Sequence, residues 1–311
     1  MTKVVALAGG VGGAKLAKGL YNTLSHEELT IIVNTGDDFQ HFGLNISPDL
    51  DTVIYNLANM SNEITGWGQR DDTWNTMGAL NKIDSETWFN LGDKDLATHL
   101  ERTRLFGQGK TKTEVALHLC KKFSVKVPVL PMTDDPVQTM ILCESLGLLS
   151  FQEYFVKHNY SPKMIGYEFV GIKEAKLNPI AEKALVEANV VILCPSNPWL
   201  SLFPILSIVG VKEILKNKKC VAVSPIIGNT ALKGPAAKIF KELNINPSAL
   251  EVANLYKDFL AGFILDIQNN AEAESISRWG IIPLVTNIIM QDDMDKERLA
   301  KEVVNFAENL R

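Results

Sequence analysis

Short apolar runs alternate with helical patterns along most of this chain, and this alternation limits the folds open to it. The runs are rich in Val, Ile and Leu, as are parallel strands that are buried on both faces. They span residues 4–8, 30–33, 125–130, 190–194, 220–224, 262–265 and 281–285. The clearest amphipathic helical patterns span 179–188, 235–243 and 294–308. This alternation predicts an α/β fold with a doubly wound, mostly parallel sheet.

Two stretches interrupt the alternation. Residues from about 52 to 123 carry helical patterns and polar turns without a convincing strand, which predicts a helical insertion beside the sheet. Residues from about 137 to 175 carry shorter patterns, including the aromatic-rich segments 151–155 and 165–170, and we expect a strand pair or a lid there. We therefore expect one domain over residues 1–311 with these two additions.

Charge and hydropathy exclude two classes of partner. The net charge is -5 and no basic stripe is present, so we expect no nucleic acid partner. The longest apolar stretch, residues 199–211, is broken by Pro204 and is shorter than the ~20 residues that span a bilayer, so we expect no membrane partner. The chain starts with a strand and a Gly-rich turn rather than a signal peptide, which predicts a cytoplasmic protein.

A Gly-rich turn follows the first apolar run. It contains Gly9, Gly10, Gly12 and Gly13, followed by Lys15. Glycines let the backbone approach a ligand closely, and a following helix directs free N–H groups at an anion. The turn is not a Walker A loop, because Leu16 stands where Ser or Thr would be needed, and it lacks the third glycine of the dinucleotide fingerprint. A phosphate cradle is favoured over a plain strand–helix turn.

Acidic residues follow in two further segments. Asn34, Thr35, Asp37 and Asp38 lie at the end of the second apolar run, where open α/β sheets bind ligands, although a turn or a helix cap would explain them equally well. Asp49 and Asp51 lie in the segment 46–52, before a helix that we expect to begin at Asp51. Two such carboxylates suit one Mg²⁺ ion that also binds phosphate oxygens. The alternative is that Asp51 or Ser47 caps the helix, and a cap that leaves one oxygen free is compatible with the metal site.

Four more polar segments complete the set. They contain residues 91–102 with Lys94 and His99, 130–136 with Asp134 and Asp135, 195–198 with Ser196 and Asn197, and 224–236 with Gly228 and Asn229. Alone, each is an ordinary turn or capped helix start, and a lone His99 suggests a structural residue. Five polar loops after separate strands nevertheless suggest one shared pocket. The residues predict an α/β protein that binds a phosphate-bearing ligand together with Mg²⁺.

In this order, the segments resemble the 2-phospho-L-lactate transferase family of coenzyme F420 biosynthesis. The resemblance covers most of the chain and implies a Rossmann-like core with a helical insertion. It implies a Mg²⁺-dependent phosphotransferase whose acceptor is the deazaflavin alcohol 7,8-didemethyl-8-hydroxy-5-deazariboflavin (FO). The donor is a guanosine diphosphate carrying a lactyl, enolpyruvyl or glyceryl group. GMP leaves and an F420-0-type product remains.

The resemblance also implies roles for particular residues. Asp49 and Asp51 would hold Mg²⁺, and one of them would accept the proton of the attacking hydroxyl. Asp51 and Lys94 would lie near FO. The guanosine diphosphate part of the donor, and likewise free GDP or GMP, would be held by the following residues: Gly9, Gly10, Gly12, Gly13, Lys15, Asn34, Thr35, Ser196, Asn197, Gly228 and Asn229. Further candidates for metal ligand or base are Asp37, Asp38, Asp134 and Asp135. We expect the protein to be a homodimer.

Two other functions compete with this one. A related family of non-catalytic, nucleotide-sugar-binding regulatory proteins has a similar fold and first loop, but it typically lacks the segments 47–52 and 133–136 that are present here. An NAD-dependent oxidoreductase is disfavoured by the incomplete fingerprint. Both segments therefore favour the transferase.

Overall fold

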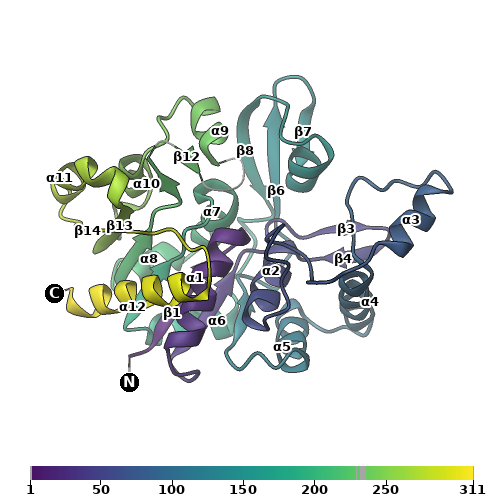
Figure 1. Cartoon of the computed structure of the whole chain (residues 1–311), viewed down its shortest axis with the longest axis horizontal. Coiled ribbons are helices and arrows are strands. Elements are labelled where there is room, and N and C mark those ends of the chain that lie inside the picture. The colour runs from purple at the N-terminus through teal and green to yellow at the C-terminus, as the bar shows by residue number, and fades with distance from the viewer. Residues whose placement is uncertain (1, 229, 232–235, 311) are drawn as a thin grey trace.

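The computed structural model of the chain describes residues 2–228, 230–231 and 236–310. Its centre is a sheet of seven parallel strands in the order β14–β13–β10–β9–β1–β2–β5 (Figure 1). The strands are β1 (Val4–Ala8), β2 (Leu29–Val33), β5 (Val129–Pro131), β9 (Val190–Leu193), β10 (Lys219–Val223), β13 (Gly262–Asp266) and β14 (Ile282–Thr286). Each apolar run expected to be a strand contributes one of these strands. The predicted doubly wound α/β fold is thereby confirmed.

The start of one strand differs from the prediction. We expected a strand over residues 125–130, whereas β5 begins at Val129. The N–H group of Val125 instead donates to the Cys120 carbonyl at 2.8 Å, which closes the end of the preceding helix, and Pro128 has no N–H group to give to a sheet. The first half of this apolar run therefore packs at a helix end.

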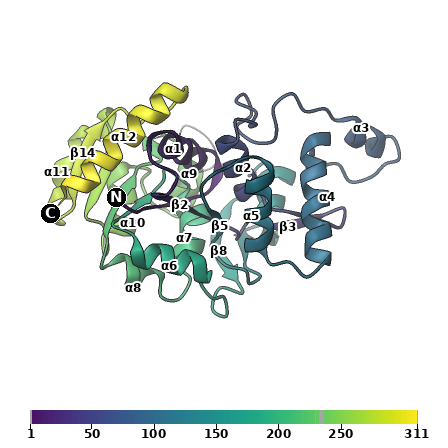
Figure 2. The same cartoon turned by 90° about the horizontal axis from the view of Figure 1, so that it is seen from below.

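Helices cover both faces of the sheet. Alternate strand residues point to opposite faces, so Val4, Ala6 and Ala8 join one buried core and Val5 and Leu7 the other. Figure 2 shows α1 (Gly10–Thr23) and α12 (Asp293–Asn309) on one side, and α6 (Pro179–Glu187) and α8 (Val211–Leu215) on the other. The result is a three-layer α/β/α arrangement.

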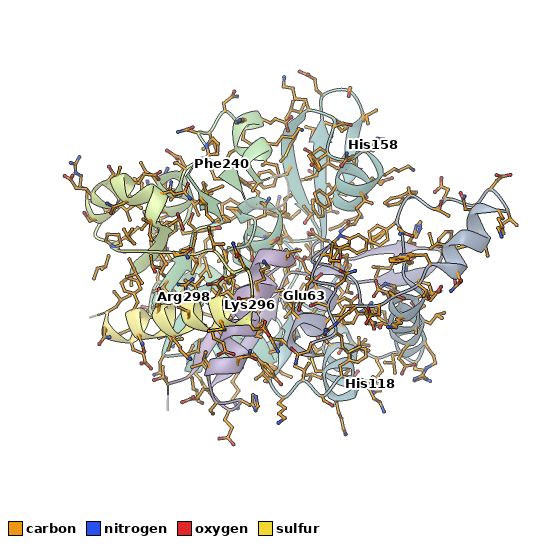
Figure 3. All side chains as sticks on the ribbon, viewed as in Figure 1. Glu63, His118, His158, Phe240, Lys296 and Arg298 are labelled. Carbon is orange, nitrogen blue, oxygen red and sulfur yellow. The ribbon has the colours of Figure 1, made fainter. Side chains whose placement is uncertain are left out.

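Helix α12 packs closely against α1. A Cβ atom on Gly19 would lie 2.1 Å from the carbonyl oxygen of Lys296, so only glycine allows this approach. Lys296 lies on α12 at this crossing (Figure 3) and pairs with Asp293 at 2.7 Å. The last helix of the chain therefore braces the helix that follows the Gly-rich turn.

The chain changes direction in the sheet at β1. From β1 it proceeds outward to β2 and β5, and it then returns to the other side of β1 to form β9, β10, β13 and β14. In open α/β sheets the crevice beyond the carboxyl ends of the strands at such a reversal is the usual ligand site. Here that crevice lies past β1 and β9.

Helices and a hairpin fill the region between β2 and β5. They are β3 (Phe39–His41), β4 (Leu44–Ile46), α2 (Pro48–Leu57), α3 (Asn75–Asn81), α4 (Asp93–Gly107) and α5 (Lys112–Lys122). Figure 1 shows α3 and α4 extending away from the sheet. Among the described residues of 52–123, pairing is limited to an isolated bridge between Ser61 and Gln69, as the helical prediction requires. Helix α2, however, begins at Pro48 rather than at Asp51, because proline suits the first helical turn.

The stretch 137–175 forms a small antiparallel sheet in the order β7–β6–β8. Its strands are β6 (Gln138–Cys143), β7 (Gly147–Ser150) and β8 (Met164–Val170), and a short helix, η1 (Glu153–Lys157), joins β7 to β8. We expected a strand pair or a lid, and strands are present. The aromatic segment at 151–155 contributes to η1 rather than to a strand, and a lid role stays a prediction.

The remaining elements lie between β9 and β14. They are η2 (Pro198–Leu202), α7 (Phe203–Leu206), β11 (Ile226–Ile227), β12 (Thr230–Ala231), α9 (Ala236–Glu242), α10 (Ala249–Tyr256), η3 (Ile267–Glu272) and α11 (Ala273–Ser277). Across the described part of the chain, no helix combines the length and the apolar character needed to cross a bilayer.

Candidate active site

The Gly-rich turn after β1 and the loop after β9 meet at the reversal point of the sheet. The N–H group of Gly9 donates to Ser196 Oγ at 3.2 Å. A Cβ atom on Gly13 would lie 2.4 Å from Ser196 Oγ, and one on Gly12 would lie 2.3 Å from the Pro195 carbonyl oxygen. Side chains at these glycines would push the two loops apart. The glycines therefore allow the two loops to pack against each other beyond the carboxyl ends of β1 and β9, and phosphate binding there stays a prediction.

Asp49 lies at the N-terminus of α1. Its Oδ1 accepts a 2.7 Å hydrogen bond from the N–H group of Gly10, and its Oδ2 accepts one of 3.0 Å from Asn34 Nδ2. The positive end of the helix dipole favours a carboxylate at this place. Burial raises the pKa of Asp49 to about 6, although the bonds from Asn34 and Gly10 oppose the shift. Each oxygen keeps a further lone pair for a ligand.

The segment after β2 adds two more acidic side chains. Asn34 fixes its start, since its side chain donates to the Leu200 carbonyl at 3.1 Å and accepts from the N–H group of Gly36 at 2.8 Å. Burial raises the pKa of Asp37 well above its usual value, and the nearby charge of Asp49 raises it further. Burial likewise raises the pKa of Asp38 to about 7, against the pull of Lys112. Carboxyl groups thus accumulate here, and Lys112 Nζ, 3.8 Å from Asp38 Oδ2, offsets part of their charge.

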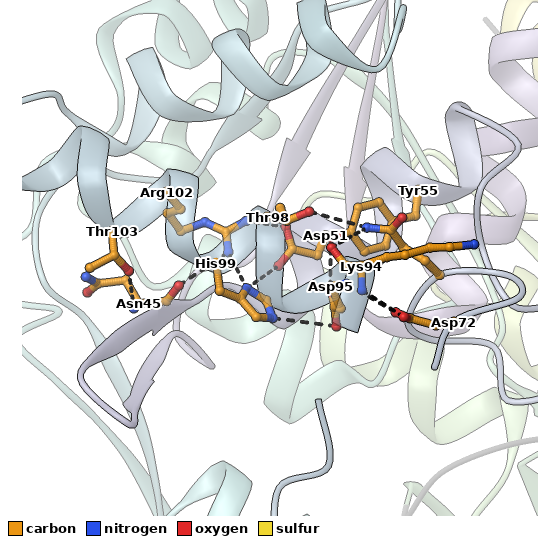
Figure 4. Close-up of polar contacts among 11 residues, drawn as sticks. Asn45, Asp51, Tyr55, Asp72, Lys94, Asp95, Thr98, His99, Arg102 and Thr103 are labelled. Atoms are coloured by element: carbon orange, nitrogen blue, oxygen red, sulfur yellow. Dashed lines mark hydrogen bonds and ion pairs between the residues drawn. The ribbon is translucent and has the colours of Figure 1, made fainter. Parts of the chain in front are cut away.

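Asp51 points to a different set of partners, although it is only two residues from Asp49. Successive residues on a helix are about 100° apart, so Asp49 and Asp51 leave α2 on different sides. Asp51 Oδ1 accepts a hydrogen bond from Arg102 Nη2, and Asp51 Oδ2 lies 3.7 Å from His99 Nδ1 (Figure 4). Helix α4 therefore supplies the surroundings of Asp51.

Arg102 belongs to a buried polar cluster between α2 and α4. Its Nη1 lies 2.9 Å from His99 Nδ1, and His99 Nε2 lies 3.5 Å from Asp95 Oδ2. Asp95 Oδ1 accepts a 2.7 Å hydrogen bond from the Tyr55 hydroxyl. Burial raises the pKa of Asp51 although Arg102 opposes the shift, whereas contacts with His99 and Tyr55 lower the pKa of Asp95 despite burial.

Lys94 lies beside this cluster at the start of α4. Its N–H group donates to Asp72 Oδ1 at 2.8 Å (Figure 4). Its Nζ donates to the Arg70 carbonyl at 2.9 Å. Gln69 Nε2 in turn lies 3.3 Å from the Lys94 carbonyl oxygen and from Thr98 Oγ1. Lys94 and Asp51 are thus placed on the same helix pair, α4 and α2, and their expected position near FO stays a prediction.

Three further predicted binding residues have partners within the protein. Lys15 Nζ donates to the Met290 carbonyl at 2.6 Å, which ties α1 to the loop after β14. Asn197 Oδ1 caps η2 by accepting from the N–H groups of Trp199 and Leu200. Ser196, described above, holds Gly9. These residues shape the walls of the crevice.

Gly228 lies at the carboxyl end of the sheet beyond β10, and Asn269 holds it there. The N–H group of Gly228 donates to Asn269 Oδ1 at 2.8 Å, and Asn269 Nδ2 donates back to the Gly228 carbonyl at 2.9 Å. Asn229, the other residue predicted in this loop, lies outside the described residues. Thr35, from the segment after β2, is fully buried.

Asp134 and Asp135 contact a different part of the protein. Both Asp134 oxygens accept from the hydroxyl of Thr113, near the start of α5, at 2.8 and 2.9 Å. Asp135 Oδ2 accepts from the N–H group of Lys176 at 2.8 Å. These hydrogen bonds connect the loop after β5 to α5 and to Lys176, and no hydrogen bond among the described residues connects either residue to Asp49 or Asp51.

The acidic residues after β2 and in the first turn of α2 offer oxygen atoms that fit a hard divalent cation such as Mg²⁺. Several buried oxygens receive no hydrogen bond from the described residues, namely Asp37 Oδ1, Asp38 Oδ1 and Asp51 Oδ2. Buried carboxylates without partners are costly unless a cation or a donor meets them. Oxygen donors are the ligands that Mg²⁺ prefers.

The side chains that surround Asp51 were not predicted from the sequence. His99 was expected to be a structural residue, and neither Asp95 nor Arg102 was assigned a role in the site. Their spacing on α4 does contain a signal, because residues separated by three, four and seven positions share one helix face. Asn269 had no signal in the sequence, since its partner lies 41 residues away.

Comparisons with known proteins show the family of this chain. The family model described as "2-phospho-L-lactate transferase CofD" matches residues 4–305. The 2-phospho-L-lactate transferase of Methanosarcina mazei is 36% identical over 301 residues, covering 97% of this chain and 99% of that relative. The enzyme of the same name from Methanocaldococcus jannaschii is 37% identical over 310 residues, covering 99% of both chains.

A differently named relative and a solved structure extend the comparison. The phosphoenolpyruvate transferase of Streptomyces griseus is 35% identical over 316 residues, covering 99% of both chains. A crystal structure of a UPF0052 family protein from Bacillus halodurans superposes with a TM-score of 0.63, covering 97% of this chain and 98% of that chain. At 14% identity, this likeness supports the fold alone. By the family model and by relatives that match nearly end to end, this chain belongs to the 2-phospho-L-lactate transferase family.

Proposed function

We propose that this protein makes an F420-0-type product by joining a three-carbon phosphate group to the deazaflavin alcohol FO. A ribityl hydroxyl of FO attacks the phosphorus that bears the three-carbon group in a guanosine-diphosphate-linked donor. The new P–O bond forms as the P–O bond to GMP breaks. The hydroxyl proton passes to a carboxylate of the protein, and GMP leaves.

The meeting of the Gly-rich turn with buried carboxylates at the reversal point of the sheet carries this proposal. Gly9, Gly10 and Ser196 lie where backbone N–H groups and a helix N-terminus favour a diphosphate. Asp49 lies against Gly10, so acidic oxygens and phosphate would be neighbours there. Such an arrangement of like charges calls for a cation between them.

The acidic residues have proposed roles in metal binding and in proton transfer. Asp49 and Asp51 would hold Mg²⁺, with Asp37 and Asp38 as neighbouring oxygen donors. When bound there, Mg²⁺ supplies positive charge that neutralises the diphosphate. One of the two proposed ligands also accepts the hydroxyl proton.

The donor and the acceptor use different elements. The donor's guanosine diphosphate would bind the Gly-rich turn and the loops that carry Asn34, Thr35, Ser196, Asn197, Gly228 and Asn229, with Lys15 bracing the turn. FO would lie near Asp51 on α2 and Lys94 at the start of α4. Phosphoryl transfer depends mainly on such positioning and charge stabilisation, so no covalent intermediate is needed.

The three-carbon group has more than one candidate. Relatives of similar identity are named after 2-phospho-L-lactate and after phosphoenolpyruvate. The lactyl, enolpyruvyl and glyceryl donors are therefore all to be tested.

A product assay tests the function. The protein is incubated with FO, Mg²⁺ and each guanylylated donor in turn, and mass spectrometry identifies the product. We expect GMP and an F420-0-type phosphodiester from one donor, and no such product without Mg²⁺. Asp51→Asn should abolish turnover while the fold stays intact, and Asp258→Asn, a change at an exposed carboxylate, should not. Full activity of Asp51→Asn would refute the role of Asp51.

The assembly and its location are separate expectations. We propose a cytoplasmic homodimer. Sedimentation velocity of the purified chain tests the dimer, and a monomer at micromolar concentration would contradict it. Fractionation of the cells that contain the protein tests the location.

A further inference from the structure

A chain of buried side chains links α2 to α4 and returns to α2. Asp51 and Tyr55 are one turn apart on α2, while Asp95, His99 and Arg102 share one face of α4. Arg102 donates to Asp51 at one end of the chain, and Tyr55 donates to Asp95 at the other (Figure 4). Both ends are therefore anchored on the same helix.

The contact between Arg102 and His99 fixes the form of the imidazole. A guanidinium group stays protonated in proteins and can only donate, so His99 Nδ1, at 2.9 Å from Arg102 Nη1, must accept. The ring is then neutral and carries its proton on Nε2, which faces Asp95 Oδ2 at 3.5 Å. His99 thus holds one arm of the guanidinium while Asp51 holds the other.

The two oxygens of Asp51 are left in different states. Oδ1 is bound by Arg102, whereas Oδ2 is buried and receives no hydrogen bond from any described residue. Arg102 is itself only 2% exposed, so solvent does not loosen the pair. This arrangement fixes the direction of Asp51 and keeps one oxygen available.

A metal ion at the cluster itself is the competing interpretation. Ligand atoms of Asp51, Asp95 and His99 lie within 4.8 Å of one another. However, Nδ1 of His99 already accepts from Arg102, and Nε2 carries the proton, so neither nitrogen offers a lone pair. The geometry favours positioning over metal binding by His99.

We propose that Arg102 and His99 are positioning residues that hold Asp51 in one orientation, with Oδ2 free to act on the acceptor alcohol or the cation. This inference rests on the proposed function, in which Asp51 meets the acceptor. Lysine is a poor replacement for Arg102, because its single ammonium nitrogen cannot reproduce the planar fork in which Nη2 meets Asp51 and Nη1 meets His99. A displacement of about 1 Å at such a residue lowers turnover by roughly 100-fold.

Kinetics of matched variants test the proposal. Arg102→Lys should lower kcat roughly 100-fold with little change in the donor KM. His99→Asn, whose amide oxygen can replace Nδ1 as the acceptor for Arg102, should retain far more activity than His99→Leu. Arg104→Lys makes the same change at an exposed position of α4 and should leave kcat unchanged. Urea unfolding of each variant separates these effects from a loss of stability.

A crystal structure of Arg102→Lys supplies a readout that does not depend on turnover. We expect the Asp51 side chain to leave the orientation seen in the native protein. An unmoved Asp51, or equal loss of kcat in His99→Asn and His99→Leu, would overturn the proposal. If the native protein makes no transfer product, the proposed function fails, and the position of Asp51 in the variant still decides the positioning role.

Discussion

At the scale of single residues, the site is unusual for its buried carboxyl groups. Asp37, Asp38, Asp49 and Asp51 all have a raised pKa, and burial is the largest cause in each case. Ionising such a group costs free energy unless a positive charge lies beside it. Burial of these carboxyl groups therefore lowers the stability of the metal-free protein, and we expect a cation and a phosphate to bind beside them.

The stability cost of one of these carboxyl groups, that of Asp38, can be measured. Its pKa is about 7 in the folded protein and near 4 in the unfolded chain, so the folded state binds more protons between these values. Stability should therefore fall as the pH rises from about 4 to 7 and level off above. Urea unfolding in EDTA at several pH values measures the fall, and Asp38→Asn should reduce it. An identical slope in Asp38→Asn and in the control Asp258→Asn would contradict this account.

Asn269 is a second residue whose effect can be isolated. Its side chain pairs with both the N–H group and the carbonyl of Gly228, so Asn269→Ala leaves both groups without partners. The loss of one to two such bonds, about 1–3 kcal/mol, should raise the donor KM by roughly tenfold. The KM for FO should not change, since α2 and α4 are untouched. Steady-state kinetics with each substrate varied, and exposed Asn270→Ala as control, test this. A rise in both KM values would argue against a specific role in donor binding.

At the scale of elements, the packing of α12 against α1 stabilises the helix that follows the Gly-rich turn. Helix α1 begins at the Gly-rich turn, and Lys15 reaches the Met290 carbonyl just before α12. A shift of α12 would therefore also move the Gly-rich turn, which is the proposed binding site of the donor. The close approach at Gly19 is the point where this packing is most easily broken.

Gly19→Ala tests the packing of these two helices. Alanine normally stabilises a helix interior by about 1 kcal/mol relative to glycine. Here the added Cβ would meet the Lys296 carbonyl oxygen at 2.1 Å, so we expect a loss of about 1–3 kcal/mol instead. Gly78→Ala in α3 is the matched control, because open space surrounds that position, and it should be neutral or stabilising. Urea unfolding compares the free energies of unfolding of the two variants. Equal stabilisation by both would show that α12 can move away from Gly19 without a loss of stability.

At the scale of the whole molecule, ligand binding distinguishes the transferase from the nucleotide-sugar-binding alternative. A ligand that binds only the folded state stabilises it by about 2.7 kcal/mol at a concentration of 100 times its Kd. We expect GDP with Mg²⁺ to raise the midpoint of thermal unfolding, and UDP-linked sugars to leave it unchanged. Stabilisation by UDP-linked sugars without any effect of GDP would favour the regulatory alternative.

Local patterns in the sequence determined the sheet and the position of its ligand loops. A buried strand needs a short apolar run and a close loop approach needs glycine, and both requirements are visible within a few residues, as at β1 and Gly9 to Gly13. The helix over residues 179–188 was visible for the same reason, since its period and its capping Asn178 are local. The family resemblance added the expectation that Asp51 and Lys94 both lie near FO.

Only the tertiary structure decided what each polar side chain meets. Asp49 and Asp51 look equivalent in the sequence, but the turn of α2 sends one to Gly10 and the other to Arg102. His99 gains its partner Asp51 from a segment 48 positions earlier, and Asn269 meets Gly228 across 41 residues. Such contacts depend on how helices pack in three dimensions, and no local pattern of residues encodes that packing.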